Sequence, residues 1–210
     1  MFAREPLPDV NAMTEPEREK FIWREFLEDS LLTAFHEAGH AVACYLLGYL
    51  CIRIEMHDDG QSEVILSRKF ISRVNATLHR KRLLTAWPKH LIDNGILTCA
   101  GPAAELRICK QHNMRIRQRD STRGDHEIIE TITKAPTTCN LNRWDFQNRV
   151  WREAETMIAT AAPWKGVTAL AGELDLRDWG ETITGKQVHS ILRQAGLQPG
   201  VYSYDDHDCP

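Results

Sequence analysis

The 210-residue sequence lacks the long apolar runs that would place a chain in a membrane. No run approaches the about 20 apolar residues that a helix needs to cross a bilayer. The first residues, MFAREPLPDV, also lack the basic and then apolar layout of a secretion signal. We therefore expect no membrane span and a cytoplasmic protein.

The sequence also lacks a basic block and closely paired cysteines. Its 26 Lys and Arg residues are balanced by 29 Asp and Glu residues and form no block that would track phosphates, so nucleic acid is not an expected partner. The six cysteines form no C-x-x-C pair. We expect most of them to be small buried hydrophobic residues, and not disulfides or metal ligands.

Most of the chain shows the apolar spacing and capping signals of helices, and these predict a mainly α-helical α+β fold. A capping box at Thr14 starts a short helix within residues 1–29. Asp29 or Ser30 is expected to cap a second helix over 31–47, which Gly48 ends. Further helices are predicted over residues 75–86, 89–110, 125–134, 142–161, 164–176 and 185–195.

Two short runs have the composition of strands. Residues 51–56 and 62–66 flank the turn signal Asp59-Gly60, and together they predict a small β-hairpin. The sequence shows no internal repeat and no linker that would separate two folding units, so one domain is expected.

The motif H-E-x-x-H lies within the segment with the clearest helical spacing, at His36, Glu37 and His40. Four residues advance a helix by about 400°, so the two imidazoles lie about 40° apart on one face and can hold one ion. Glu37 lies beside that position, where it can take a proton from zinc-bound water and pass it to the leaving amine. With nine histidines in the chain, a chance match is the alternative interpretation.

A catalytic zinc site normally has three protein ligands, so a third must be found. No histidine follows His40 before residue 57, which excludes the extended metzincin motif. The acidic candidates for the third ligand are Glu63, Glu105, Asp120 and Asp125.

Several segments resemble the peptidase domain of the FtsH-type membrane AAA proteases. Residues 33–42 (TAFHEAGHAV) resemble that family's A-x-H-E-A-G-H-A segment, and residues 100–105 (AGPAAE) resemble its G-G-R-A-A-E segment. Residues 122–125 (TRGD) resemble its G-A-x-x-D stretch, and residues 167–192 are similar to its closing helices. The resemblance spans about residues 30–195.

The resemblance implies Asp125 as the third zinc ligand, because the matching aspartate binds zinc in the family. A plain helix N-cap is the alternative interpretation of Asp125, and Asp120 is its rival as ligand. Glu105 is expected to support a histidine that binds the metal, without binding the metal itself, and an ordinary surface or helix-end carboxylate is the alternative. Where the family has Gly-Gly-Arg, residues 100–102 of this sequence are Ala-Gly-Pro. The resemblance therefore does not predict how this segment binds substrate.

The expected function is therefore that of a zinc metalloendopeptidase that cuts flexible or unfolded polypeptides. The chain has no G-x-x-x-x-G-K-[ST] loop and so no ATPase of its own; a separate ATPase partner and a homo-oligomer are compatible with the family. Two alternatives are a regulatory zincin that cuts one partner protein and a non-catalytic zinc-binding interaction module. The expected organisation is an N-terminal extension (1–29), a zincin-like metallopeptidase domain with a hairpin edge (30–196) and a flexible tail (197–210).

Overall fold

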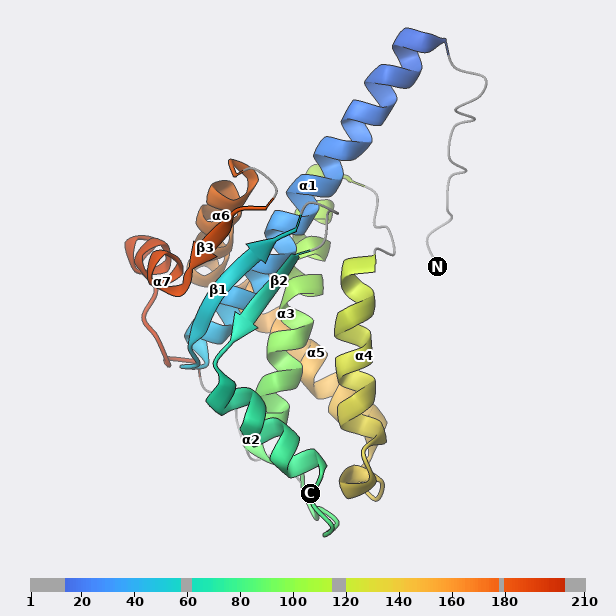
Figure 1. Ribbon diagram of the computed structural model, residues 1–210, viewed down its shortest axis with the longest axis vertical. Helices are drawn as coiled ribbons and strands as arrows, with labels where there is room; N and C mark the ends of the chain where they lie inside the picture. The colour runs from blue at the N-terminus through green and yellow to red at the C-terminus, as the bar shows by residue number, and fades with distance from the viewer. Residues whose placement is uncertain (1–13, 58–61, 115–119, 178–179, 203–210) are drawn as a thin grey trace.

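The computed structural model is mainly helical, with one small antiparallel sheet (Figure 1). It describes residues 14–57, 62–114, 120–177 and 180–202, and among these it leaves out the side chains of 18–28 and 120–122. In chain order the elements are α1 (Glu15–Leu46), β1 (Cys51–Met56), β2 (Ser62–Leu66), α2 (Arg68–Leu78), α3 (Lys89–His112), α4 (Asp120–Lys134), the short 3-10 helix η2 (Pro136–Thr138), α5 (Arg143–Ala159), α6 (Ala161–Asp175), β3 (Thr182–Thr184) and α7 (Gly185–Gln194).

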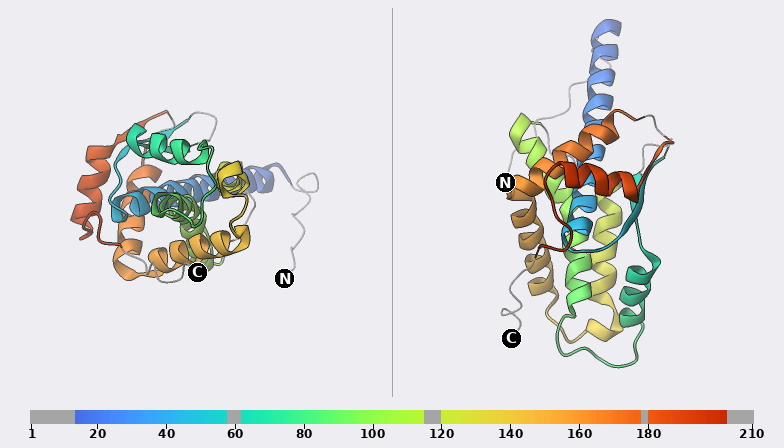
Figure 2. Two further views of the ribbon diagram at one scale, coloured as in Figure 1. Left: turned by 90° about the horizontal axis from the view of Figure 1, so that it is seen from below. Right: turned by 90° about the vertical axis from the view of Figure 1, so that its left-hand side faces the viewer.

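The two helices α1 and α3 form the centre of the molecule and pack along each other. Figure 2, seen from below, shows α5 and α6 on one side of this pair and α2 on the other. The sheet and α7 cover α1 on a further side, while α4 lies against α3. The N-terminal end of α1 projects beyond the other elements (Figure 1).

Helix α1 runs without a break from Glu15 to Leu46, so the prediction of two helices separated at Asp29 and Ser30 is wrong. The Thr33 hydroxyl donates to the Asp29 carbonyl at 2.9 Å, a contact between successive turns of one helix. Residues that favour N-caps therefore lie inside the helix, and the expected break between two helices at this point has no counterpart. The predicted ends are correct: the Thr14 capping box is present, and Gly48 has the positive φ of 79° that often follows a helix.

The predicted hairpin is confirmed, because β1 pairs antiparallel with β2. A third strand that the sequence did not predict, β3, pairs with the other edge of β1 and gives the order β2-β1-β3. Ile54 and Ile183 face each other in this pairing, and both are fully buried. The turn signal at residues 59–60 lies outside the described residues.

Helix α2 begins and ends earlier than the predicted segment 75–86, which is therefore wrong. Ser67 caps it by accepting a hydrogen bond from the Phe70 amide. Phe70, Val74 and Leu78 then repeat every four residues on the buried face, so the apolar period begins well before residue 75. The other helices lie near their predicted positions, although α4 begins at Asp120, five residues before the predicted start at 125.

The first six residues of the expected tail pack against the body of the protein. Leu197 is buried, the Gly200 amide donates to the Tyr45 carbonyl, and the Tyr202 hydroxyl donates to Glu153. Residues 203–210 lie outside the described part of the chain. No helix among the described residues has the length and apolar character needed to span a membrane.

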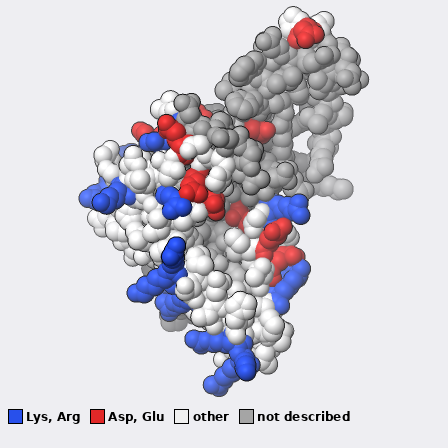
Figure 3. All heavy atoms as spheres, viewed as in Figure 1, with Lys and Arg blue, Asp and Glu red and all other residues white. Residues whose placement is uncertain are grey.

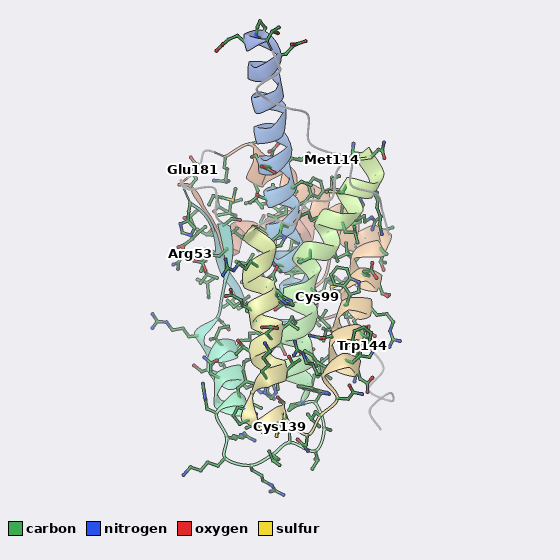
Figure 4. The ribbon with its side chains drawn as sticks, turned by 90° about the vertical axis from the view of Figure 1, so that its right-hand side faces the viewer. Arg53, Cys99, Met114, Cys139, Trp144 and Glu181 are labelled. Carbon is green, nitrogen blue, oxygen red and sulfur yellow. The ribbon has the colours of Figure 1, made fainter. Side chains whose placement is uncertain are left out.

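The expectation for the cysteines is confirmed for four of them, which are free and buried. Cys139 is free and exposed, and Cys209 lies outside the described residues. Figure 4 shows Cys99 inside the molecule and Cys139 at its lower end.

Candidate metal centre

The C-terminal half of α1 carries three buried polar side chains that lie close together. His36, Glu37 and His40 are 1%, 2% and 7% exposed. Ionisable groups withdrawn from water need hydrogen-bond partners or a metal, because burial alone strongly disfavours their charged forms. The partners here come from α3, α4 and β2.

Two glycines allow α1 and α3 to approach closely at this point. A Cβ atom on Gly39 would overlap the Ala100 carbonyl, and one on Gly101 would overlap the imidazole of His40. The His40 ring therefore occupies space that only a glycine leaves free on α3.

Three side-chain groups converge on one point beside α1. Nε2 of His36 lies 3.0 Å from Nε2 of His40 and 3.0 Å from Oδ2 of Asp125, and His40 Nε2 lies 3.4 Å from Asp125 Oδ1. Zinc bonds of about 2.0–2.1 Å in a tetrahedron would separate two ligand atoms by about 3.3 Å. These three atoms therefore lie at about the spacing that one bound cation requires.

Each imidazole is oriented by an acceptor on its far side. His40 Nδ1 donates to the Leu97 carbonyl at 2.8 Å, and His36 Nδ1 donates to Oε2 of Glu105 at 3.2 Å. A carbonyl oxygen can only accept, so the proton of a neutral His40 ring is on Nδ1. In the neutral rings Nε2 therefore carries a lone pair directed at the shared point, as in histidine ligands held by a carboxylate or carbonyl.

The carboxylates set the charge of the metal-free site. Burial lowers the pKa of His36, but the adjacent Asp125 and Glu105 outweigh burial and raise that pKa to about 10. For His40, burial lowers the pKa and the charge of Asp125 raises it overall. Burial raises the pKa of Asp125, but the charge of His40 and contact with His36 lower it to about 2. Without metal, a proton on the imidazoles thus faces an ionised aspartate.

Glu37 lies beside this centre and makes one hydrogen bond. Its Oε1 accepts from the Ser62 hydroxyl at 2.8 Å. Its Oε2 is buried and has no hydrogen-bond partner among the described residues. Glu37 thus presents one unoccupied carboxylate oxygen next to the three converging ligand groups.

The centre opens into a cleft of about 760 Å³. Strand β2 forms one rim and α4 forms the other, while α1 and α3 supply the floor. Away from the histidines the cleft is walled by aliphatic side chains of α2 and α4: Ile71, Val74, Leu78, Ile128 and Ile132.

Charge is unevenly distributed around the face that carries β2 and α4. Figure 3 shows mainly Lys and Arg side chains at the lower end of this face, below the sheet. Nearer its middle, over the strands and α4, Asp and Glu side chains lie beside Lys and Arg side chains. The lower end of the face is therefore basic, whereas the charges nearer its middle are mixed.

Asp125 is the aspartate that the structure brings to the histidines. Because α4 begins at Asp120, Asp125 lies within the helix, and its interpretation as a plain N-cap is wrong. The side chain of Asp120, the rival ligand, is outside the description.

The two candidate glutamates lie in different places. Glu105 is buried and touches His36 from behind, so its interpretation as a surface carboxylate is wrong. Glu63 lies on the rim of the cleft, where its exposed side chain is 3.7 Å from His57 and belongs to another group.

Sequence reasoning missed three contributors: the Leu97 carbonyl, Gly101 as the floor beneath His40, and Ser62. A backbone carbonyl has no sequence signature. Gly101 could have been found, since it lies four residues before Glu105 and so on the same face of α3.

Comparisons of this chain with protein-family models and with curated proteins found no match.

Proposed function

We propose that the protein is a zinc metallopeptidase with a zincin-like site, similar to the peptidase domain of the FtsH-type proteases. The observation that carries the proposal is the convergence of His36, His40 and Asp125 beside the buried carboxylate of Glu37. A structural role would explain a buried histidine pair, but it would leave the buried Oε2 of Glu37, which has no hydrogen-bond partner among the described residues, unexplained.

The donor set favours zinc in a catalytic role. Two imidazoles and one carboxylate are three protein ligands, and catalytic zinc sites leave a further position open. The cleft reaches all three ligand residues, so water and substrate have access. Imidazole and carboxylate also accept other divalent ions, so the metal content must be measured.

The chemistry then divides between the ion and the chain. Zinc supplies a Lewis acid that lowers the pKa of bound water to about 7 and polarises the scissile carbonyl. Glu37 acts as general base: its free Oε2 takes a proton from the attacking water and returns it to the leaving amine. Glu105 and the Leu97 carbonyl hold the imidazoles in the orientation that exposes their Nε2 lone pairs.

The cleft suits an extended polypeptide. Strand β2 pairs with β1 along one edge, and among the described residues no strand pairs with its other edge. An extended chain can add to such an edge through backbone hydrogen bonds, with its side chains in neighbouring pockets. The aliphatic wall of α2 and α4 then favours apolar side chains. A folded substrate would first need unfolding, which is the task of a separate ATPase partner.

The free cysteines support a cytoplasmic location. Five cysteines are described, and none of them forms a disulfide. Thiols persist in the reducing cytoplasm, whereas secreted proteins tend to form disulfides.

Cleavage of an unfolded protein such as denatured casein tests the proposal. Wild type and Glu37→Gln are compared after zinc loading, with the metal content of both determined. We expect wild type to cut and Glu37→Gln to hold zinc without cutting. If both hold zinc and neither cuts, a regulatory protease with one target or a non-catalytic zinc-binding module replaces the proposal. If neither binds a divalent metal, the metal centre itself is rejected.

A further inference from the structure

The hydrogen bond between Ser62 and Glu37 joins the proposed base to the rim of the cleft. Ser62 is the first residue of β2, and its partly buried hydroxyl donates to Oε1 of Glu37 at 2.8 Å. No other hydrogen bond to the Glu37 side chain exists among the described residues.

A carboxylate that accepts a hydrogen bond at one oxygen has a more restricted orientation than a carboxylate without one. Rotation about the terminal torsion of Glu37 turns the plane of its two equivalent oxygens, and that torsion has no sharp intrinsic preference. The Ser62 hydroxyl restricts this rotation by holding one oxygen, Oε1. Oε2, which is buried and has no hydrogen-bond partner among the described residues, is then the oxygen that remains basic and available.

The hydroxyl also lies where substrate is expected. Ser62 belongs to the edge strand β2 and lines the cleft, so it lies next to the space that an extended chain would enter. The residue that holds the base therefore lies at the rim of the cleft.

We propose that Ser62 is a positioning residue that fixes the Glu37 carboxylate for general-base catalysis. The inference rests on the proposed peptidase function, but the hydrogen bond itself can be tested without it. Ser62 keeps its proton throughout, and the proton taken from water goes to Oε2 of Glu37.

The first test is steady-state cleavage of an unfolded peptide by zinc-loaded Ser62→Ala. We expect kcat to fall about 10- to 100-fold, the range found when residues that orient a site are removed. KM and bound zinc should stay at their wild-type values, because the substitution leaves the metal ligands and the aliphatic wall intact. Ser62→Thr, which keeps the hydroxyl and suits a strand, should restore kcat.

Ser67→Ala is the matched control. Ser67 lies just beyond the other end of β2 and caps α2, away from Glu37. Loss of this cap should lower the stability of the protein without lowering kcat. An equal loss of kcat in Ser67→Ala would show that damage to the strand, and not loss of the hydrogen bond, accounts for the effect at Ser62.

The second test uses metal-free protein and no activity. A double-mutant cycle of Ser62→Ala and Glu37→Ala, followed by urea denaturation, isolates the coupling between the two side chains. A hydrogen bond to a carboxylate predicts a coupling of roughly 10- to 100-fold in the unfolding equilibrium constant.

The outcomes separate the two claims. If wild type cleaves nothing while the coupling is present, the proposed function fails and the contact is structural. If wild type cleaves and Ser62→Ala cleaves equally well, the positioning role is rejected. Failure of Ser62→Thr to restore kcat would likewise reject the hydroxyl as the cause.

Discussion

The two histidines of the centre are held by acceptors of different charge. His36 donates to the carboxylate of Glu105, whereas His40 donates to the neutral carbonyl of Leu97. A carboxylate increases the basicity of the ring that it holds more than a carbonyl does. If the site binds zinc as proposed, Glu105 contributes to metal affinity through charge as well as through orientation, and a substitution that keeps its shape can separate these effects.

Glu105→Gln should weaken zinc binding about 10- to 100-fold, because the amide still accepts a hydrogen bond but carries no charge. Competition with a chromophoric chelator measures this affinity. Glu155→Gln, at an exposed position on α5, removes the same charge away from the centre and should leave the affinity unchanged. Equal affinities for wild type and Glu105→Gln would mean that Glu105 only fills space.

The raised pKa of His36 predicts how pH acts on the metal-free protein. Its ordinary pKa of 6.5 rises to about 10, so its contribution to stability is fully present below pH 6.5 and is lost as the pH rises to about 10. Thermal melts of metal-free protein should show Tm falling across this window. Zinc-loaded protein should lack this fall, because the metal replaces the proton. A metal-free Tm that does not change between pH 6.5 and 10 would contradict the charge assignment.

At the scale of the elements, the close approach of α1 and α3 builds the centre. A side chain at Gly39 or Gly101 would not fit between the two helices. The Leu97 carbonyl that orients His40 comes from the same part of α3. The metal site and the central helix packing are therefore one structure, and a change in the spacing of the helices must change both.

Gly101→Ala should lower both stability and zinc content, because its Cβ would overlap the His40 ring. Overpacking of this kind typically costs about 1–3 kcal/mol. Gly172→Ala in α6 is the matched control, since a Cβ there meets nothing within 4 Å. It should stabilise the protein by about 0.5–1 kcal/mol through helix propensity. Urea denaturation and metal analysis report both quantities.

The sequence predicted elements where the signal is local and failed where it is not. The hairpin and the end of α1 at Gly48 follow from turn and cap residues. Asp29 and Ser30 suggested a break because cap-forming residues also occur inside helices. The three residues of β3 are too few to show a period, and they form a strand only because β1 has a free edge.

The residues of the candidate site also differ in whether the sequence could predict them. The four-residue spacing of His36 and His40 was sufficient to place both on one face of a helix. Asp125 comes from a helix far along the chain, and only the family resemblance singled it out. Ser62 could not be predicted, because a serine at the start of a strand carries no sign that it will meet a glutamate on another element.

At the scale of the whole molecule, the cleft is formed by elements that meet only in the folded chain. Its rims come from β2 and α4, and its aliphatic wall comes from α2 and α4. One of the wall residues, Ile128, is 43% exposed in spite of its apolar side chain. An exposed aliphatic group in a cleft is available to bind an apolar part of a ligand.

Ile128→Ser should raise KM for unfolded substrates several-fold and change kcat little, because it removes contact area and leaves the reacting groups in place. Leu176→Ser is the matched control, since Leu176 is an exposed aliphatic residue that does not line the cleft. Initial rates over a range of substrate concentrations separate the two constants. A fall in kcat without a change in KM would argue against the wall as a substrate-binding surface.

The proton that His36 retains in the metal-free protein has a consequence for the order of assembly. Without that proton, the imidazole lone pairs and the carboxylates of the buried site would repel one another until an ion bound. Here the proton on His36 offsets the charge of Asp125, so the fold does not require an ion to balance the site. If the site binds zinc as proposed, folding and metal loading are separate events, and the supply of metal controls only the second.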